Sequence, residues 1–519
     1  MNIPATGIRK RFTLIACGVI AIISVLVLSY EITEPFWGYM DFNCNIQSIA
    51  ARNFIKHGLF ATRLMPAVNT GDVPDGNFDL YVHHPPMIAH YLALFYSIFG
   101  ETEWAGRLFF VLCAVGSALL VFAIGRLYLS QLESLFAALA FALFPATAYF
   151  GRMINYESPG LFFALLAFWG YCLFLKSGSD RAIWLMYAAN LLGLLVCWED
   201  YLFSFAIAFH WLLWGRKKGE SSWKVLLLPA STVVVFAILM ANILAVAGGL
   251  SANTFGGSMR WILQLRLGTQ VDVGEYFTFL EFLSRELLAL KELFTPIAVY
   301  GAGAWLVLLI IGRLRGARRR EHFDWLVLSF LFYGVVYLLI FRQPAYLHNY
   351  MVYYMGPAVG FAAVIAAREL ILLCLAPKRW VKVAAAVLLG YLFLAAGAFE
   401  FFKLHENPTR CDWIDLGKYL RHYTDSDEAV ILSWQGGNLY TEFYSDREIL
   451  RGITTVEQFQ RALAEARNEV VVYMDTAKPA ASAQLLRHLK DNYVSMLVMV
   501  NERQFVAFIV RVPRKCRRG

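Results

Sequence analysis

The chain has 519 residues, 59% of them hydrophobic and 16% charged, with a mean hydropathy of +0.53. Soluble proteins carry about 25% charged residues, so the composition excludes a soluble globular protein and indicates a polytopic α-helical membrane protein. The formal net charge of +8 does not indicate a nucleic-acid partner, because the excess Lys and Arg lie in short loops.

The N-terminal segment predicts a first membrane span that is retained. Arg9, Lys10 and Arg11 precede an apolar run over residues 12–30, and no small-residue cleavage site follows it. Basic residues before a first span favour a cytoplasmic N-terminus. We therefore expect the next loop, residues 31–103, to lie outside the cytoplasm.

That long loop is predicted to carry two helices at the membrane surface. Residues 42–57 have a helical repeat of apolar positions on one face, which predicts an amphipathic helix directly after Asp41. Residues 86–99 are apolar but only about fourteen long, which is short for a span and suits a helix along the interface. The apolar face of the first helix comprises Ile46, Ile49, Ala50, Phe54 and Ile55.

Apolar runs predict eleven membrane spans in all. They lie near residues 12–30, 104–126, 131–149, 159–175, 182–197, 201–214, 225–247, 294–312, 323–341, 350–367 and 383–401. Alternate loops carry the basic residues, and all of these loops fall on the side of the N-terminus, which is the pattern of the positive-inside rule. A further span at residues 86–99 would move every later loop to the opposite side of the membrane and place the basic loops outside.

The composition changes near residue 402, where charges rise and apolar runs shorten. We expect a membrane domain over residues 1–402 and a small extracytoplasmic α/β domain over residues 403–519, because an odd number of spans places the C-terminus outside. Strands are predicted at 429–433, 470–474, 494–500 and 505–512, and helices at 455–467 and 479–491.

Ionisable residues gather near the span ends instead of the span centres. Ion-coupled transporters usually need charged groups along an intramembrane path, so this distribution favours an active site at one membrane face. Asp41 is a candidate for such a site, between the first span and the surface helix. An equally open interpretation is that its carboxylate caps the helix of residues 42–57.

Four further polar segments fall on the same predicted face. His83 and His84 precede two prolines, where a histidine can donate a hydrogen bond to a lipid phosphate, or serve only as a turn residue. Glu157 follows the third span, either as an acid raised in pKa by desolvation or as a solvated loop residue. Two other outer turns contribute the candidates Glu199, Asp200, Arg342, His348, Asn349 and Tyr350.

Several short motifs, in order and spacing, resemble the GT-C superfamily of glycosyltransferases. The resemblance covers residues 30–370 and is nearest to bacterial relatives of protein O-mannosyltransferases, of the lipid A aminoarabinose transferase and of Rgt-type transferases. It rests on Asp41 after the first span and on the segments Ile49-Ala50-Ala51-Arg52-Asn53-Phe54, His57-Gly58, His83-His84-Pro85-Pro86-Met87, Glu103-Trp104-Ala105-Gly106-Arg107-Leu108 and Arg126-Leu127-Tyr128.

The resemblance implies roles for particular residues. Asp41 matches the proposed catalytic base of the family. Glu157 matches a second acid, with Ser158 between it and the proline that usually follows directly. His84 stands where many relatives have a basic residue, often lysine, that contacts the lipid phosphate.

The implied chemistry is transfer of a sugar from a polyprenyl-phosphate donor to an extracytoplasmic glycan, lipid or protein, at a bacterial inner membrane. Asp41 would deprotonate the acceptor hydroxyl, and His83, His84, Arg342 and His348 are the candidates that would stabilise the departing phosphate. A single displacement would invert the anomeric centre. No cofactor is required by this scheme; a divalent cation held by Asp41 and Glu157 is a further option.

Two other classes of function stay open at this stage. A flippase or exporter of a lipid-linked sugar would share the membrane domain, although the span centres carry no charges for it. A non-catalytic scaffold would depend on the residues after Phe402 instead of Asp41 or Glu157.

Overall fold

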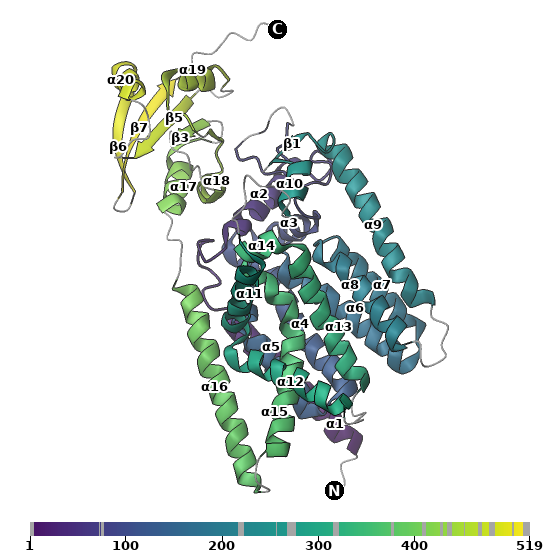
Figure 1. Ribbon diagram of the computed structural model, residues 1–519. Helices are drawn as coiled ribbons and strands as arrows, with labels where there is room; N and C mark the ends of the chain where they lie inside the picture. The colour runs from purple at the N-terminus through teal and green to yellow at the C-terminus, as the bar shows by residue number, and fades with distance from the viewer. Residues whose placement is uncertain are drawn as a thin grey trace. The chain divides into compact units, whose positions relative to one another are not determined.

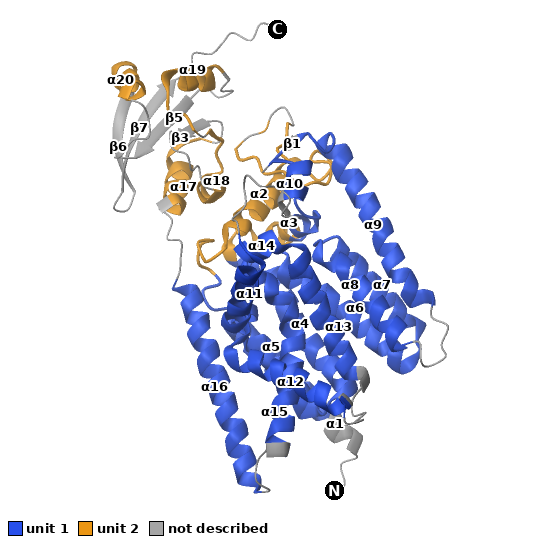
Figure 2. Ribbon diagram, in the orientation of Figure 1, with its two compact units in different colours: residues 1–32, 82–91, 104–406 blue, residues 33–81, 92–103, 407–519 orange. Residues whose placement is uncertain are grey.

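The computed structural model describes residues 5–71, 73, 77–215, 223–255, 257–266, 277–314, 321–374, 378–406, 412–425, 429–432, 439–450, 452–465, 470–476, 483–500 and 503–511. The chain divides into two compact units, shown in Figure 2. The first unit comprises residues 1–32, 82–91 and 104–406, and the second comprises 33–81, 92–103 and 407–519. The two units are not placed relative to one another.

The first unit is built from helices (Figure 1). It contains α1 (Ala5–Leu28), α4 (Glu103–Tyr128, from its second residue), α5 (Gln131–Leu143), η1 (Ala146–Phe150), α6 (Glu157–Ser177), α7 (Asp180–Leu194), α8 (Glu199–Leu213), α9 (Trp223–Ala247), α10 (Met259–Arg266), α11 (Phe279–Phe294), α12 (Pro296–Leu314), α13 (Glu321–Ile340), α14 (Arg342–Leu347), η3 (Asn349–Met355), α15 (Gly356–Cys374) and α16 (Arg379–His405). A two-stranded hairpin of β1 (Asn253–Thr254) and β2 (Gly257–Ser258) precedes α10. Helix α3 (Met87–Phe99) is divided between the units.

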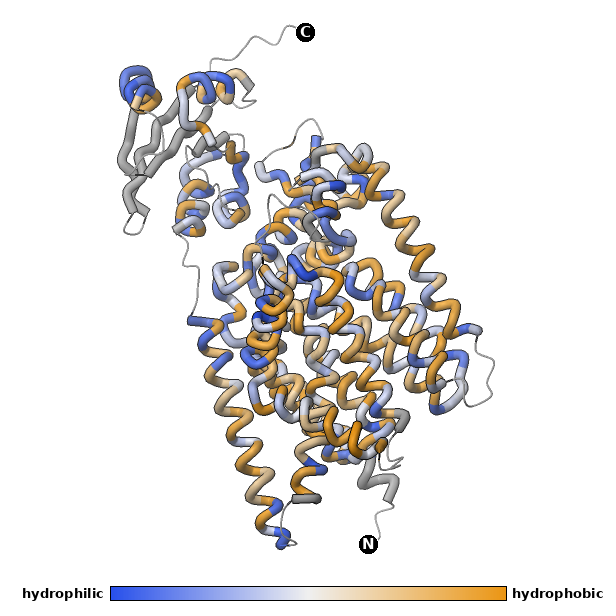
Figure 3. The backbone as a smooth tube through the Cα atoms, viewed as in Figure 1, coloured by the Kyte–Doolittle hydropathy of each residue, from blue (hydrophilic) through white to orange (hydrophobic). Residues whose placement is uncertain are grey.

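Long apolar helices agree with a multi-pass membrane protein (Figure 3). In the described part of the chain, seven helices are long and apolar enough to cross a membrane, or up to eight if α11 and α12 form one span broken by a 113° bend. The seven are Lys10–Leu28, Glu103–Tyr128, Glu157–Ser177, Trp223–Ala247, Phe323–Ile340, Asn349–Leu372 and Arg379–His405.

Three of the expected spans coincide with shorter helices. Residues 131–149, 182–197 and 201–214 fall on α5, α7 and α8, which have 13, 15 and 15 residues. A 15-residue helix is about 22 Å long, less than the roughly 30 Å of a bilayer core. The number of eleven spans therefore stays a prediction. Two of the basic loops behind it, residues 216–218 and 315–320, lie outside the described residues.

The segment between α5 and α6 is irregular for identifiable reasons. Ser130 and Glu133 form a capping box that starts α5, and α5 ends at Leu143, two residues before Pro145. The π-helix η1 follows, with all five of its residues buried. The expected continuous span over residues 131–149 is therefore interrupted, and the chain enters α6 from a buried, non-helical stretch.

The second unit combines the long loop with the C-terminal region. It contains α2 (Phe42–His57), α17 (Asp412–Tyr423), β3 (Ala429–Leu432), α18 (Leu439–Ser445), β4 (Ile449–Leu450), α19 (Val456–Glu465), β5 (Val470–Thr476), α20 (Ala483–Asn492), β6 (Val494–Val500) and β7 (Arg503–Arg511). The five strands form one sheet in the order β4-β3-β5-β7-β6. Strand β3 is parallel to β4 and β5, and β7 is antiparallel to β5 and β6.

The predicted strands and helices of the C-terminal region are present, although the predicted ends at 433, 467, 479 and 512 lie outside the described residues. Thr455 accepts a hydrogen bond from the Gln458 N–H, and the Gln458 side chain accepts one from the Thr455 N–H, so the predicted capping box starts α19. Phe459, Leu485 and Leu489 are fully buried between α19 and α20. The domain limits of 1–402 and 403–519 stay a prediction, and residues 33–81 and 92–103 belong to the same compact unit as the C-terminal sheet.

Helix α2 has the predicted bounds but not the predicted single apolar face. Every residue from Cys44 to Phe54 is buried, including Asn45, Gln47 and Arg52, whereas Ile55 is 48% exposed. Polar residues can be buried on this helix because the unit supplies hydrogen-bond partners: Ser48 bonds the Tyr96 hydroxyl at 2.9 Å, and Asn53 donates to the Ala67 and Asn69 carbonyls. The amphipathic interpretation was wrong for this reason.

Candidate active site

The His83-His84 loop is tied to the start of α8 in the first unit. The indole N–H of Trp198 donates to the His83 carbonyl at 2.8 Å, and the Met87 N–H donates to the Leu195 carbonyl at 3.2 Å. The His83 Nε2 lies 2.9 Å from the Phe255 carbonyl, to which it donates. His83 therefore anchors the loop through both its backbone and its ring.

His84 lies beside the start of α6. Its ring stacks on Tyr156 with 3.7 Å between centroids and 13° between planes, and Tyr156 directly precedes Glu157. Glu157 is the first residue of α6 and is only 4% exposed, so the alternative of a solvated loop acid was wrong. The fold thus brings His84 and Glu157, 73 positions apart in the sequence, to one place.

Glu157, Glu199 and Asp200 form a buried acidic cluster. Glu199 and Asp200 lie in the first turn of α8, and all three side chains are at most 4% exposed. Glu199 is within electrostatic range of both Glu157 and Asp200. Gly193 leaves the necessary space, because a Cβ there would lie 1.9 Å from Asp200 Oδ2.

Much of the hydrogen-bonding capacity of this cluster is unused. Glu157 Oε2 and Glu199 Oε2 are buried and have no hydrogen-bond partner within the described residues. The Asp200 carboxyl lies beside Cys197 and the Tyr333 hydroxyl. Buried polar atoms are normally paired, so these carboxyl oxygens have acceptor capacity to offer to a ligand. Oxygens of this kind are suitable partners for the hydroxyl groups of a sugar.

Tyrosines complete the cluster and were not predicted. The Tyr337 hydroxyl donates to Glu199 Oε1 at 2.6 Å, and the Tyr354 hydroxyl donates to Cys197 Sγ at 3.8 Å. Tyr333 packs on Tyr354 with 5.8 Å between ring centroids. Two of the tyrosines lie four residues apart on α13, so the signal available in the sequence was a pair of polar rings on one face of a membrane span.

The residues predicted near position 342 are divided between a surface and a buried segment. Arg342 is exposed at the start of α14, which replaces the expected turn. His348 stacks on Tyr350 at 5.3 Å, and Tyr350 lies 5.5 Å from the ring of Phe150 in η1. Arg342 is thus the only one of these three with an exposed side chain.

A buried cation that the sequence motifs did not predict lies next to η1. Arg152, which is 7% exposed, follows η1 and donates from Nη2 to His405 Nε2 at 2.8 Å. The His405 Nδ1 in turn lies 2.7 Å from the Phe401 carbonyl. Its position at the end of an apolar run could have marked Arg152 as a candidate in the sequence, because buried arginines in membrane proteins usually have a functional or pairing role.

Asp41 belongs to the second unit, so its expected proximity to Glu157 stays a prediction. It occupies the N-cap position of α2, but its side chain makes no capping hydrogen bond. Its Oδ2 accepts from the Gly38 N–H at 3.1 Å, and its Oδ1 lies 3.6 Å from Cys44 Sγ. The carboxylate, 7% exposed, is therefore oriented by its surroundings without serving as the helix cap.

No group of three or more His, Cys, Asp or Glu side chains suited to a metal ion is found in the described ranges. The acidic cluster thus offers hydrogen-bonding oxygens to a ligand but no ready set of metal ligands. The divalent cation held by Asp41 and Glu157 stays a prediction.

Comparison with known proteins places this site in a known fold. Residues 83–243 match the family model described as dolichyl-phosphate-mannose-protein mannosyltransferase. No curated protein sequence matches the chain. The matched segment contains His83, His84, Glu157, Glu199 and Asp200, which are the predicted residues that the first unit brings together.

Solved structures extend the likeness over nearly the whole chain. ArnT from Cupriavidus metallidurans, bound to undecaprenyl phosphate, has a TM-score of 0.62 at 13% identity, covering 97% of this chain and 98% of that chain. The oligosaccharyltransferase AglB from Archaeoglobus fulgidus, in complex with an inhibitory peptide and a dolichol-phosphate, has a TM-score of 0.57 at 13% identity, covering 90% and 69%. The arabinofuranosyltransferase AftD from Mycobacteria has a TM-score of 0.51 at 15% identity, covering 97% and 40%.

These matches agree with the resemblance inferred from Asp41, the His83-His84-Pro85-Pro86-Met87 segment and the other short motifs. The chain has the fold of the GT-C superfamily of glycosyltransferases, and the resemblance to that superfamily is confirmed.

Proposed function

We propose that this protein is an integral-membrane glycosyltransferase that moves a sugar from a polyprenyl-phosphate donor to an extracytoplasmic acceptor. The observation that carries the proposal is the cluster in the first unit: the residues predicted from the motifs meet there, inside the segment that matches a mannosyltransferase family model. Two proteins of similar fold were solved with undecaprenyl phosphate and dolichol-phosphate, which supports a donor of the same class.

Asp41 is the base in this proposal. Its carboxylate is oriented by the Gly38 N–H and is not engaged in capping α2, which leaves it able to accept a proton. The acceptor hydroxyl oxygen forms a bond to the anomeric carbon while the bond from that carbon to the phosphate oxygen breaks. The electron pair of the broken bond leaves with the polyprenyl phosphate, the hydroxyl proton passes to Asp41, and the anomeric centre is inverted.

The remaining candidates bind the two substrates. His84, held flat against Tyr156, is placed beside the acidic cluster and donates a hydrogen bond to the departing phosphate. Arg342, which is exposed, supplies a positive charge for the same phosphate, and His348 is a further donor. Glu157 and Glu199 accept hydrogen bonds from sugar hydroxyls through their unpaired oxygens, with Asp200 beside them in the same cluster. His83 supports this arrangement by anchoring the loop.

The reaction requires the donor and acceptor to meet at the outer face of a bacterial inner membrane. The positive-inside pattern of the basic loops supports a cytoplasmic N-terminus and an extracytoplasmic second unit. Labelling of single cysteines introduced at Asp79 and at Lys490 with a membrane-impermeant reagent tests this sidedness. Protection of both sites in intact spheroplasts would contradict it.

Transfer is best tested with purified protein in proteoliposomes. A radiolabelled polyprenyl-phosphate sugar is supplied with an envelope glycan fraction, and the product is analysed by mass spectrometry and by nuclear magnetic resonance of the anomeric proton. Asp41→Asn is expected to lower the rate by at least about 1,000-fold, because the carboxamide cannot take the proton. The matched control is Asp79→Asn in the same loop, whose exposed side chain has no role in the reaction.

Retained transfer by Asp41→Asn would remove Asp41 as the base. A product with the same anomeric configuration as the donor would contradict a single displacement. Movement of the labelled lipid across the membrane with no glycan product would favour the flippase that the sequence left open.

A further inference from the structure

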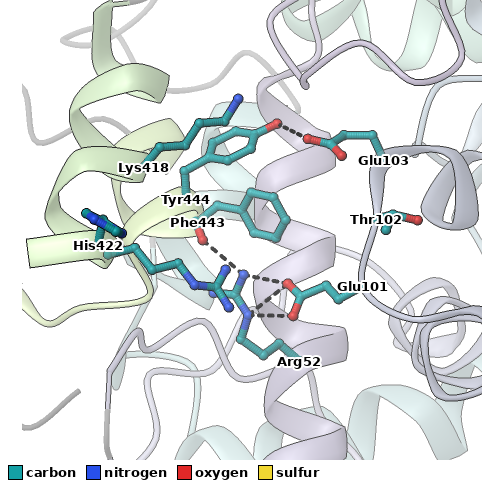
Figure 4. A pocket seen from close by; sticks show the side chains of 9 residues that line it. Arg52, Glu101, Thr102, Glu103, Lys418, His422, Phe443 and Tyr444 are labelled. Atoms are coloured by element: carbon teal, nitrogen blue, oxygen red, sulfur yellow. Dashed lines mark hydrogen bonds and ion pairs between the residues drawn. The ribbon is translucent and has the colours of Figure 1, made fainter. Parts of the chain in front are cut away.

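The second unit contains a pocket of about 430 Å³ that the proposed reaction does not use (Figure 4). Its volume lies in the range of small-molecule sites, about 300–1,000 Å³. It is lined from α2, from the segment that leads into α4, and from α17 and α18. The lining residues are Arg52, Glu101, Thr102, Glu103, Lys418, Arg421, His422, Phe443 and Tyr444.

The inner part of the pocket is buried and held by specific contacts. Arg52 donates to the Phe443 carbonyl at 2.9 Å, and its guanidinium lies 4.7 Å from the centre of the Phe443 ring. The Tyr444 hydroxyl donates to Glu103 at 3.0 Å and accepts from the Phe36 N–H at 2.9 Å. These contacts make the aromatic side chains of α18 a rigid surface for a ligand.

The outer part of the pocket carries exposed basic side chains of α17. Lys418, Arg421 and His422 are spaced three and four residues apart, so they lie on one side of that helix. The Lys418 ammonium lies 5.4 Å from the centre of the Tyr444 ring. Within the described residues, neither Lys418 nor Arg421 has a carboxylate at ion-pair distance.

Neither of these two cations is held at ion-pair distance by a described carboxylate, so both can contact a ligand, and Arg421 is also within electrostatic range of Asp446. Arg52 is already paired with Glu101 at 2.5 Å and with Asp446 at 3.1 Å, so its charge is compensated. Glu103 and Thr102 add groups that can hydrogen-bond to hydroxyls. The pocket therefore combines sites for one anionic group, for neutral hydroxyls and for the apolar face of a ring. The two carboxylates disfavour a polyanion such as nucleic acid.

We infer that this pocket binds a sugar that carries a phosphate or carboxylate, as the recognition element of the acceptor glycan. The role of this sugar as an acceptor rests on the proposed transferase function. The binding of the sugar to the pocket does not depend on that function. Lys418 and Arg421 hold the anionic group, and Phe443 and Tyr444 face the apolar side of the sugar ring. Glu103 and Thr102 accept hydrogen bonds from its hydroxyls.

Binding is tested on the full-length protein in nanodiscs of zwitterionic lipid, with glucose 6-phosphate as the probe and glucose and inorganic phosphate as comparisons. Saturation-transfer nuclear magnetic resonance gives the dissociation constants. Glucose 6-phosphate is expected to bind at least tenfold more tightly than either comparison. The double variant Lys418→Ala/Arg421→Ala is expected to weaken its binding at least tenfold.

The matched control is Arg487→Ala/Lys490→Ala, which removes two charges at the same spacing from an exposed part of α20 in the same unit. Unchanged binding in this control and loss in the α17 variant support the site. Equal binding of inorganic phosphate and glucose 6-phosphate would overturn the carbohydrate assignment. Equal loss in both double variants would overturn the pocket, because it would show a general effect of charge.

Two further measurements identify the source of the ligand and separate this inference from the transfer reaction. If the natural acceptor is a lipid, a phosphorylated glycolipid included in the nanodiscs should compete with glucose 6-phosphate. If the natural acceptor is a soluble glycan, a phosphorylated oligosaccharide in solution should compete instead. Failure of both to compete would overturn the acceptor role. Asp41→Asn should bind the probe as the wild type does, so a failure of the proposed catalysis leaves this binding result intact.

Discussion

Two buried groups of charges, one in each unit, differ in how far neighbouring residues compensate them. In the second unit Arg52 is paired with two carboxylates and a backbone carbonyl. In the first unit Glu157, Glu199 and Asp200 lie close together, with unpaired oxygens and no ion pair within the described residues. Burial costs a charged group several kcal/mol unless partners compensate it. The paired arginine is therefore explained by structure alone, whereas the unpaired acids need a functional explanation.

Asp446 shows how completely the second unit compensates its charges. Burial alone would raise the pKa of its carboxyl, but Arg52 and Lys56 outweigh this and hold the pKa below its ordinary value. The contribution of this group to stability is present above the unfolded-state pKa of about 3.9 and is lost as the pH falls through the lower folded-state pKa. Neutral conditions thus keep Asp446 ionised and paired.

The largest effect that separates the two regions is expected from Arg52→Ala. It leaves Glu101 and Asp446 without their buried partner, which should destabilise the second unit by about 3–5 kcal/mol. Thermal unfolding of the purified protein in detergent measures this loss. Lys56→Ala, which removes a more exposed partner of Asp446, is the control and should cost less than about 1 kcal/mol. Equal effects of the two changes would mean that burial of the network is unimportant.

The next effect is expected from Glu157→Gln in the first unit. The change removes a carboxylate from a cluster of acids, so the fold should be retained, while sugar binding and transfer should fall by about 100-fold. Steady-state transfer in proteoliposomes, with melting temperature measured in parallel, checks both parts. Loss of folding together with activity would contradict the contrast between the units, because it would make the acid structural.

A smaller effect is expected from Tyr337→Phe. This hydroxyl is the hydrogen-bond donor to Glu199, and its removal leaves a further buried oxygen unpaired, at a cost of about 1–3 kcal/mol in stability. Chemical denaturation followed by tryptophan fluorescence measures the change. Tyr391→Phe on α16, where the ring is 66% exposed, should have no measurable effect. An unaltered Tyr337→Phe variant would show that water already satisfies Glu199.

The smallest effect is expected from metal removal. The proposed displacement proceeds without a metal, so dialysis against a chelator should leave the transfer rate within about twofold of the untreated protein. Re-addition of Mg²⁺ or Mn²⁺ after dialysis is the control. A rate that disappears on dialysis and returns with the cation would establish the metal held by Asp41 and Glu157 and would change the role of both carboxylates.

Local patterns in the sequence were sufficient for most individual elements. The helix predicted over 42–57 is Phe42–His57, the surface helix predicted over 86–99 is Met87–Phe99, and the strand predicted over 494–500 is Val494–Val500. These elements depend on residue periodicity, caps and breakers within a few positions. The motifs also pointed to His84 and Glu157, which the fold then brings together.

By itself, then, the sequence determined a polytopic membrane protein, many of its individual helices and strands, and the resemblance to GT-C glycosyltransferases. Only the tertiary structure decided which polar groups meet: 391 residues separate Arg52 from the Phe443 carbonyl that it binds, and Tyr337 reaches Glu199 from 138 residues away. It also decided that Glu199 and Asp200 are buried in the first turn of α8. Burial and pairing depend on packing between distant segments, and periodicity along the chain carries no information about those distances.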